Sequence, residues 1–190
     1  AKNHRIINVR LIDNARLGSD YSGILLGGVN HLVKDCTLIG NGDGINIGSG
    51  CLVSGNIVSN NADDGIVVGD GSTISGCTIY SNTDLGISTG TGCTVSGNTS
   101  RDNGSYGIYT SSGCTITGNT AYNNGSTGIR AGSGSTVVGN TAYYNQNYGI
   151  LLGGNSLVDQ NTAYSNNQSG GFYTNISACA SCTFGLNHAP

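Results

Sequence analysis

The 190-residue chain contains no tryptophan, no methionine and a single proline, and only 9% of its residues are charged. Its formal net charge is −3, whereas a nucleic-acid-binding protein typically carries an excess of basic residues on one surface. No run of about 18 apolar residues is present, so the sequence predicts no transmembrane helix. A charged segment followed by an apolar core is missing too, so no signal peptide is expected. We therefore expect neither a nucleic-acid nor a membrane partner.

Glycine and cysteine are plentiful instead, with 33 and 7 copies. Near the end of the chain, Cys179 and Cys182 form a C-x-x-C that has no second matching pair, which argues against a zinc site. A local disulfide between these two residues, or two free thiols, is expected. The other five cysteines lie within a repeat and are Cys36, Cys51, Cys77, Cys93 and Cys114.

The repeat is marked by one glycine that recurs every 21 residues and is followed by isoleucine in its first seven copies. Seven units span residues 23–169. They are flanked by an N-terminal coil and loop (1–22) and a C-terminal coil or cap (170–190), and we expect residues 1–190 to form a single domain. At the end the register slips by one, so Gly171-Phe172 is predicted to take the Gly-Ile place. The recurring glycines are Gly23, Gly44, Gly65, Gly86, Gly107, Gly128, Gly149 and Gly170.

Within a unit such as GIYTSSGCTITGNTAYNNGST, short runs alternate in polarity with a period of 2, which indicates strands. A unit this short accommodates three strands and three turns. Each strand must then pair with its copy in the next unit, about 4.8 Å away, and the sheets are parallel. The prediction is an all-β, right-handed parallel β-helix with first, second and third sheets in chain order and 21 residues per coil. Ile, Val and Ala columns are predicted to point inward.

Two columns of asparagine are predicted to occupy two corners of the coil. Stacked amides can hydrogen-bond along the coil axis and satisfy buried turns. Asparagine also tolerates the left-handed conformation that a sharp corner needs. We therefore assign these residues a structural role. One column holds Asn61, Asn82, Asn103, Asn124, Asn145 and Asn166; the other holds Asn56, Asn98, Asn119, Asn140 and Asn161, and is interrupted by Cys77.

The repeated phrase and the asparagine columns resemble the right-handed parallel β-helix proteins of the pectin-lyase-like superfamily. The resemblance covers at least residues 23–169. It implies the fold and leaves the activity open, because this fold carries many activities.

Four aspartates fall in adjacent columns. Asp43 and Asp64 directly precede the recurring glycine, and Asp63 and Asp84 stand two places before it. Four carboxylates in three successive coils raise one another's pKa unless a cation or proton intervenes. We take all four as candidate catalytic residues and as candidate calcium ligands, so the expected cofactor is calcium or none. The alternative is that Asp merely favours turns and keeps the surface soluble.

The same region resembles the polygalacturonase family of inverting glycosidases. Residues 41–45, NGDGI, resemble that family's Asn-Thr-Asp-Gly-Ile motif, and its Asp-Asp pair matches residues 63–64 one coil later. The resemblance implies general-acid and base roles for Asp43, Asp63 and Asp64. The chain has Leu85-Gly86 in place of the family's Gly-His-Gly, and it lacks the Arg-Ile-Lys motif. The Asp-Pro-His signature of alginate epimerases is absent as well, because the single proline is Pro190.

Outward columns suggest where a ligand would bind. The third sheet should present a strip of stacked tyrosines, a platform for sugar rings or another subunit, although Thr and Tyr are also ordinary strand residues. Arg130 is predicted to be the one cation projecting from the first sheet. A lattice of Thr and Ser on the second sheet resembles the faces of ice-binding solenoids. The candidate substrate-binding residues are Tyr109, Arg130, Tyr122, Tyr143 and Tyr164.

The N-terminal segment and the histidines give weaker signals. Residues 15–22 are predicted to form a longer loop, and we hypothesise that it overhangs the first sheet and supplies Arg16 as a further cation. His4, His31 and His188 are far apart in sequence and register. We expect them at surface or cap positions rather than in a metal site.

The sequence thus favours a carbohydrate-active or carbohydrate-binding β-helix that works on an extended polysaccharide along the first sheet. If it is an enzyme, a hydrolase or lyase is expected; whether it is one stays open. The alternative is a non-catalytic structural, adhesion or assembly solenoid, with ice binding third. A homo-oligomer is compatible with the strip of tyrosines, and an extracellular or cell-surface location is expected.

Overall fold

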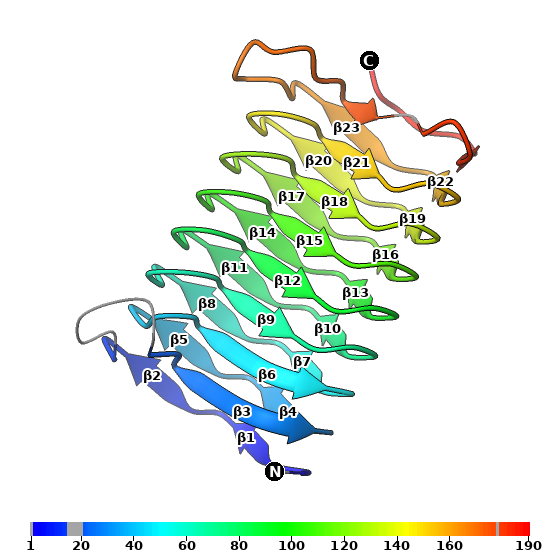
Figure 1. Cartoon of the computed structure of the whole chain (residues 1–190). Helices are drawn as coiled ribbons and strands as arrows, with labels where there is room; N and C mark the ends of the chain where they lie inside the picture. Colours follow the sequence, from blue (N-terminus) through cyan, green and yellow to red (C-terminus); the bar gives the residue numbers. More distant parts are fainter. Residues whose placement is uncertain (1, 15–20, 178) are drawn as a thin grey trace.

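The computed structural model describes residues 2–14, 21–177 and 179–190. The chain winds into a coil whose successive strands fall in turn on three parallel sheets, so each sheet takes every third strand (Figure 1). This confirms the predicted all-β, three-sheet solenoid of about seven turns and about 21 residues per coil. In the part of the chain that the structure describes, no helix has the length and apolar character needed to cross a bilayer.

Each sheet is a stack of short strands. The first sheet contains β3 (Ile24–Val29), β6 (Ile45–Ser49), β9 (Ile66–Val68), β12 (Ile87–Thr89), β15 (Ile108–Thr110), β18 (Ile129–Ala131), β21 (Ile150–Leu152) and β24 (Ile176–Ser177). The second contains β1 (Arg5–Ile7), β4 (Leu32–Lys34), β7 (Leu52–Ser54), β10 (Thr73–Ser75), β13 (Thr94–Ser96), β16 (Thr115–Thr117), β19 (Thr136–Val138), β22 (Leu157–Asp159) and β25 (Thr183–Phe184). The third contains β2 (Arg10–Ile12), β5 (Thr37–Ile39), β8 (Ile57–Ser59), β11 (Thr78–Tyr80), β14 (Thr99–Arg101), β17 (Thr120–Tyr122), β20 (Thr141–Tyr143) and β23 (Thr162–Tyr164).

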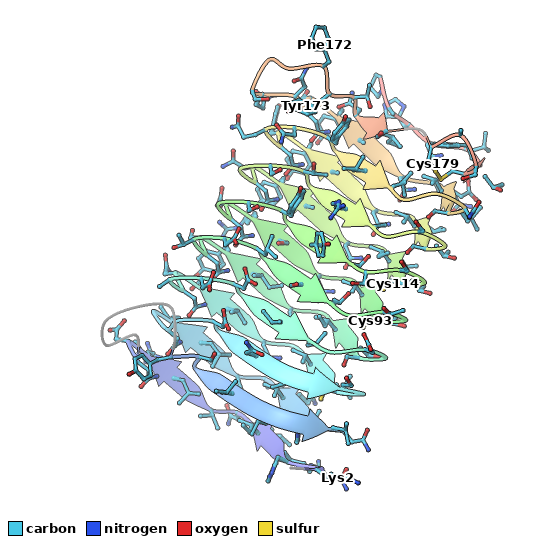
Figure 2. The ribbon with its side chains drawn as sticks, in the orientation of Figure 1. Lys2, Cys93, Cys114, Phe172, Tyr173 and Cys179 are labelled. Atoms are coloured by element: carbon cyan, nitrogen blue, oxygen red, sulfur yellow. A yellow bond between two sulfur atoms is a disulfide. The ribbon has the colours of Figure 1, made fainter. Side chains whose placement is uncertain are left out.

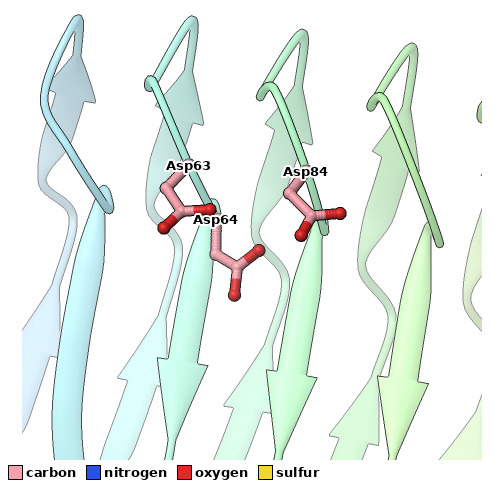
Figure 3. A group of neighbouring side chains, drawn as sticks. All are labelled: Asp63, Asp64 and Asp84. Carbon is pink, nitrogen blue, oxygen red and sulfur yellow. The ribbon is translucent and has the colours of Figure 1, made fainter. Parts of the chain in front are cut away.

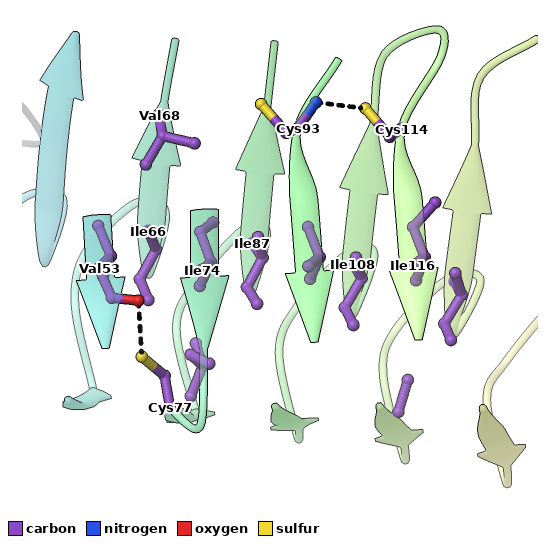
Figure 4. Close-up of a cluster of buried hydrophobic side chains, with 14 of the residues drawn as sticks. Val53, Ile66, Val68, Ile74, Cys77, Ile87, Cys93, Ile108, Cys114 and Ile116 are labelled. Atoms are coloured by element: carbon purple, nitrogen blue, oxygen red, sulfur yellow. Dashed lines mark hydrogen bonds between the residues drawn. The ribbon is translucent and has the colours of Figure 1, made fainter. Parts of the chain in front are cut away.

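The core is made of columns of apolar side chains that repeat with the sequence period. Residues 21 apart are paired in the register of all three sheets, as in Ile87 with Ile108 on the first sheet and Ile74 with Val95 on the second. All four side chains are fully buried, and Figure 4 shows Ile74, Ile87 and Ile108 within this core. A strand of three residues can therefore hold its place, because its inward side chains stack on similar apolar neighbours in the coils above and below.

The recurring glycine is required by close packing between coils. A Cβ atom on Gly65 would lie 2.5 Å from the Gly86 carbonyl oxygen and 2.9 Å from Nδ2 of Asn82. Neither neighbour can move freely, since one is backbone and the other belongs to a buried hydrogen-bonded column. The lack of a side chain, rather than an unusual backbone angle, explains why glycine directly precedes the first seven strands of the first sheet.

The three corners of a coil share one local design. In one representative coil, the residues at the corners with a left-handed backbone are Gly113, Gly118 and Asn123, with φ values of 68°, 62° and 54°. The next residue at each corner points inward; at the last two corners it is a column asparagine, Asn119 or Asn124. The expectation that column asparagines adopt the left-handed conformation themselves was wrong. The residue before them does so, and this frees the asparagine side chain to turn toward the axis.

Both asparagine columns form hydrogen-bonded ladders, one of them interrupted at Cys77. The side-chain oxygen of Asn82 accepts hydrogen bonds from both the backbone N–H and the side-chain amide of Asn61, at 3.1 and 2.8 Å. Asn119 receives the same pair from Asn98, at 2.9 and 3.0 Å. The predicted structural role is confirmed, because each amide satisfies a buried backbone donor that the turn would otherwise leave unpaired.

The cysteines inside the repeat take part in equivalent columns. Sγ of Cys114 accepts the backbone N–H of Cys93 at 3.4 Å, in a Ser/Cys column at the corner between the first and second sheets (Figure 4). Cys77 interrupts an asparagine ladder, where its Sγ accepts the Asn56 N–H at 3.4 Å. Burial raises the pKa of the Cys77 thiol, so the group stays neutral. All five of these cysteines are buried and free.

The C-terminal coil differs from the predicted register. Ile176, not Phe172, pairs with Ile150 of the preceding coil, and Phe172 is fully exposed (Figure 2). Asn175 takes the backbone place of the recurring glycine by accepting the Ile150 N–H at 2.9 Å, and its side chain also ends the asparagine ladder. Residues 170–174 are therefore an insertion. Of the two states expected for Cys179 and Cys182, a disulfide or two free thiols, the structure has the disulfide.

The N-terminal end brings a further correction. His31 is 1% exposed, and its ring stacks on that of His4 at 5.2 Å, so these two residues are neighbours rather than far apart in register. Nδ1 of His31 accepts the His4 N–H, which leaves Nε2 to donate to the Gly27 carbonyl. A longer first coil explains the 27-residue offset between the two histidines. Residues 15–20, including Arg16, lie outside the described residues.

Candidate functional site

Three aspartates meet at the turn that leads into the first sheet. Asp63 and Asp64 precede β9, and Asp84 precedes β12, the next strand of the stack. A carboxylate oxygen from each lies within 4.8 Å of the others (Figure 3). Asp63 and Asp64 are partly exposed and Asp84 is exposed. The 21-residue period is what brings these side chains together, since neighbouring coils place equivalent residues one inter-strand step apart.

Asp43, the fourth predicted acid, plays a different part in this arrangement. Its carboxylate is 9% exposed and accepts hydrogen bonds from Asn46 Nδ2 at 2.8 Å, Ser22 Oγ at 3.3 Å and the Asp64 N–H at 3.3 Å. These three donors come from three successive coils, so Asp43 links the coils by hydrogen bonds. It fixes the backbone of Asp64 through the Asp64 N–H and is not a member of the group of three.

Asp64 has the most perturbed acidity of the group. Burial raises the pKa of its carboxyl from 3.8 to about 6; the Leu85 N–H, which donates to Oδ1 at 2.8 Å, opposes the rise, and the negative charges of Asp63, Asp84 and Asp43 add to it. A carboxyl that is partly protonated near neutral pH can donate or accept a proton in a reaction. Desolvation next to like charges is also the setting in which functional carboxylates are found.

The same three carboxylates offer oxygen ligands for a divalent cation. Calcium takes 6–8 oxygen ligands at about 2.3–2.6 Å, so the group supplies only part of a coordination shell. The remaining ligands would have to come from water, backbone carbonyls or a bound substrate. Asp63, Asp64 and Asp84 are the residues of this site that fit such a role.

One and two coils beyond Asp84, aromatic rings and a cation gather on the same sheet, on β15 and β18. Tyr106 occupies the column of Asp43 and Asp64, directly before the recurring glycine, and its ring lies 5.7 Å from that of Tyr109 on β15. The Arg130 guanidinium, on β18, lies over the Tyr109 ring at 4.8 Å and 5.9 Å from the Tyr106 ring. Among the described residues Arg130 forms no salt bridge.

A cleft of about 390 Å³ opens beside this group, at the ends of β15, β18 and β21. Tyr109, Arg130 and Leu151 form its wall on the sheet, and Ser112 and Ser133 line it from the following turns. Its volume falls in the range of ordinary small-ligand pockets. The mixture of an aromatic ring, a cation and hydroxyl groups suits a polar ligand that also has apolar faces.

The predicted tyrosine strip lies on the third sheet, away from this cleft. Tyr122 and Tyr143 stack with centroids 4.8 Å apart and an interplanar angle of 3°, and Tyr164 continues the stack at 5.2 Å and 2°. Tyr144 meets Tyr143 edge-on and is 50% exposed. Because the rings cover one another's faces, the strip presents mainly ring edges and hydroxyl groups. Since these tyrosines lie on the third sheet, they form a surface separate from Tyr109 and Arg130 on the first sheet.

Sequence reasoning missed Tyr106 and Asn46. Tyr106 stands in the same column as Asp64, so alignment of the repeats contained the signal. Asn46 points outward from β6 and holds Asp43 through a contact between residues three apart, which the repeat pattern does not reveal. The site as built runs along the first sheet from the three acids to Tyr106 and then to the cleft.

These features together define a parallel β-helix with an acidic group and a polar cleft on one sheet. The chain belongs to the right-handed β-helix family, whose model, described as a right handed beta helix region, matches residues 1–141. No curated protein matches the chain in sequence.

Solved structures resemble the fold. The periplasmic alginate epimerase AlgG is 17% identical, with a TM-score of 0.77 over 97% of this chain and 49% of its own. The A-module of the Azotobacter vinelandii mannuronan C-5 epimerase AlgE6 is 18% identical, with a TM-score of 0.69 over 85% of this chain and 58% of its own. The Dettilon tailspike protein is 17% identical, with a TM-score of 0.53 over 94% and 48%. At these identities the likeness concerns the fold, and this chain spans about half the length of these proteins.

Proposed function

We propose that the chain binds an extended polysaccharide along the outer face of the first sheet and acts on it through Asp64. The observation that carries the proposal is the raised pKa of Asp64 within a group of three carboxylates, on the same face as an aromatic and cationic cleft. A polymer is the natural ligand, because the acids and the cleft lie on successive coils of one sheet rather than in a single closed pocket.

In the proposed reaction, protonated Asp64 donates its proton to the glycosidic oxygen of the leaving sugar. Asp63 or Asp84 attacks the anomeric carbon as nucleophile while the bond to the leaving oxygen breaks, and a water molecule deprotonated by Asp64 then releases the sugar from that carboxylate. The carboxylate oxygens lie within 4.8 Å, nearer to the separation of about 5–5.5 Å typical of retaining glycosidases than to the 6.5–9.5 Å of inverting ones. We therefore favour hydrolysis with retention. Elimination assisted by calcium on the three acids is the alternative chemistry for the same residues.

The structural neighbours are consistent with this proposal. Two are epimerases of alginate or mannuronan and one is a tailspike protein, and the first is periplasmic by name. By analogy of fold we propose an extracellular or cell-surface setting for this chain. The missing Asp-Pro-His signature argues against epimerisation by the same residues.

The test is a screen for turnover on polysaccharides, with and without a chelator. The Asp64→Asn variant keeps the side-chain oxygen that accepts the Leu85 N–H and removes the proton, so product release should fall by about 10²-fold or more. Asp159→Asn is the matched control, because Asp159 also accepts a backbone amide, from Leu186 at 2.7 Å, but lies on the second sheet. Equal activity of the wild type and Asp64→Asn would refute the catalytic role.

A second function is favoured by one observation on the third sheet. Tyr144 has a left-handed backbone with φ of 54° and is half exposed, although bulky residues disfavour this conformation. Contact of Tyr122, Tyr143, Tyr164 and Tyr144 with a partner would offset the energetic cost of the left-handed backbone at Tyr144. The alternative function is therefore that of an assembly module. Concentration-dependent association that is lost in Tyr143→Ser, with no turnover on any polysaccharide, would favour this function over the first.

A further inference from the structure

We infer that the glycan bound along the first sheet is uncharged, built from neutral sugars and not from uronates. The inference rests on the proposed function and adds the class of substrate. It comes from the charge pattern of one face. Within the described residues, the strands of the first sheet project a single cation, Arg130, and the turns that lead into them carry Asp63, Asp64 and Asp84.

Like charges make this face unfavourable for a polyuronate, which carries a carboxylate on every sugar. A polymer laid along coils about 4.8 Å apart brings several of its carboxylates close to Asp63 and Asp84, and to Asp64 whenever Asp64 is ionised. Two like charges about 4 Å apart weaken binding by roughly fivefold in water and by more where water is excluded. The whole chain, with a formal charge of −3, offers no long-range attraction to balance this repulsion.

Arg130 alone does not change that balance. Its guanidinium is held over the Tyr109 ring at 4.8 Å, and its strand β18 is three coils beyond β9, which follows Asp64. It can meet one carboxylate of a polymer at that coil. The sugars bound near the acids would still face negative charge.

A neutral glycan fits the same groups well. Sugar hydroxyl groups donate hydrogen bonds to carboxylates, which act only as acceptors when ionised, and the Ser112 and Ser133 hydroxyls that line the cleft can both donate and accept. The guanidinium of Arg130 donates to hydroxyl oxygens. The rings of Tyr106 and Tyr109 supply apolar surface for the C–H faces of sugar rings.

The test is calorimetric binding of the whole chain to two panels of linear oligosaccharides of equal length. One panel contains neutral glucose, mannose, galactose and xylose oligomers, and the other contains galacturonate, mannuronate and guluronate oligomers. Each is measured with chelator and with added calcium, at about 0.01 M and about 1 M salt, where the Debye length falls from about 30 to about 3 Å. We expect a neutral oligomer to bind at least about tenfold more tightly than any uronate oligomer at low salt, with an affinity nearly independent of salt.

Other outcomes separate the two levels of the argument. Tighter binding of a uronate oligomer, with or without calcium, overturns the neutral-glycan inference and leaves the proposed polysaccharide function standing. Binding of neither panel overturns the proposed function and the inference with it.

A pair of variants tests the electrostatic cause. In Asp63→Asn/Asp84→Asn, uronate binding at low salt should strengthen by about fivefold or more, because the repelling charges are gone. The control, Asp35→Asn/Asp159→Asn, removes the same net charge from turn and strand positions outside the first sheet and should not strengthen uronate binding to that extent. Equal strengthening in both double variants, or weaker uronate binding in the first, contradicts the assignment of the repulsion to Asp63 and Asp84.

Discussion

Replacing Asp64 with asparagine should make the protein more stable above about pH 6, although it removes the proposed acid–base group. The folded state raises the pKa of Asp64 from 3.8 to about 6, mainly through burial. The protonated carboxyl therefore contributes stability that is complete below pH 3.8 and is lost as the pH rises through about 6. Asparagine does not ionise and keeps the oxygen that accepts the Leu85 N–H at 2.8 Å, so the variant avoids this loss.

The size of the effect follows from the shift. A difference of about 2.2 pKa units corresponds to at most about 3 kcal/mol. Because Asp64 is partly exposed, solvent screening reduces the expected gain to about 1 kcal/mol. For a chain of this length, that gain raises the melting temperature by about 2–4 °C.

Urea unfolding followed by far-ultraviolet circular dichroism, at about pH 4 and about pH 8, measures this difference. We expect the wild type and Asp64→Asn to be close in stability at the lower pH and to separate at the higher pH, with the variant more stable. Asp159→Asn shows the effect of losing a carboxylate that accepts a backbone amide on another sheet. If Asp64→Asn is less stable than the wild type at about pH 8, the assignment of a desolvated, repelled carboxylate to Asp64 is refuted.

Three further substitutions test the packing of the coil. Cys77→Asn should complete the interrupted ladder and raise the free energy of unfolding by about 1 kcal/mol in urea titrations, because a strong acceptor replaces sulfur opposite the Asn56 N–H; a loss of stability would contradict this. Gly65→Ala should cost about 3 kcal/mol or more, since its Cβ would lie 2.5 Å from the Gly86 carbonyl oxygen, and an unchanged melting temperature would show that the coils can separate there. Gln160→Gly should stabilise by about 0.5–1 kcal/mol, because Gln160 has φ of 55° at a corner where five preceding coils place glycine; no gain in thermal unfolding would mean that its backbone is unstrained.

The sequence by itself determined the regular part of the molecule. A period of 21 residues makes Ile87 and Ile108 neighbours once strands stack, and the same arithmetic predicts the inward columns, both asparagine ladders and the adjacency of Asp63, Asp64 and Asp84. These predictions hold because a solenoid converts separation along the chain into one inter-strand step, so no long-range guess is needed.

Only the tertiary structure decided the strand register where the 21-residue period breaks, and the acidity and hydrogen bonding of individual aspartates. Residues 170–174 shift the last coil, so that Ile176 rather than Phe172 pairs with Ile150. The longer first coil stacks His31 on His4. The repeat length alone does not predict how many residues an insertion places outside the paired strands. The pKa of Asp64 and the fixing of Asp43 by three donors also lie beyond the pattern. Both depend on burial and on atoms contributed by neighbouring coils, and those become known only when the side chains are placed in three dimensions.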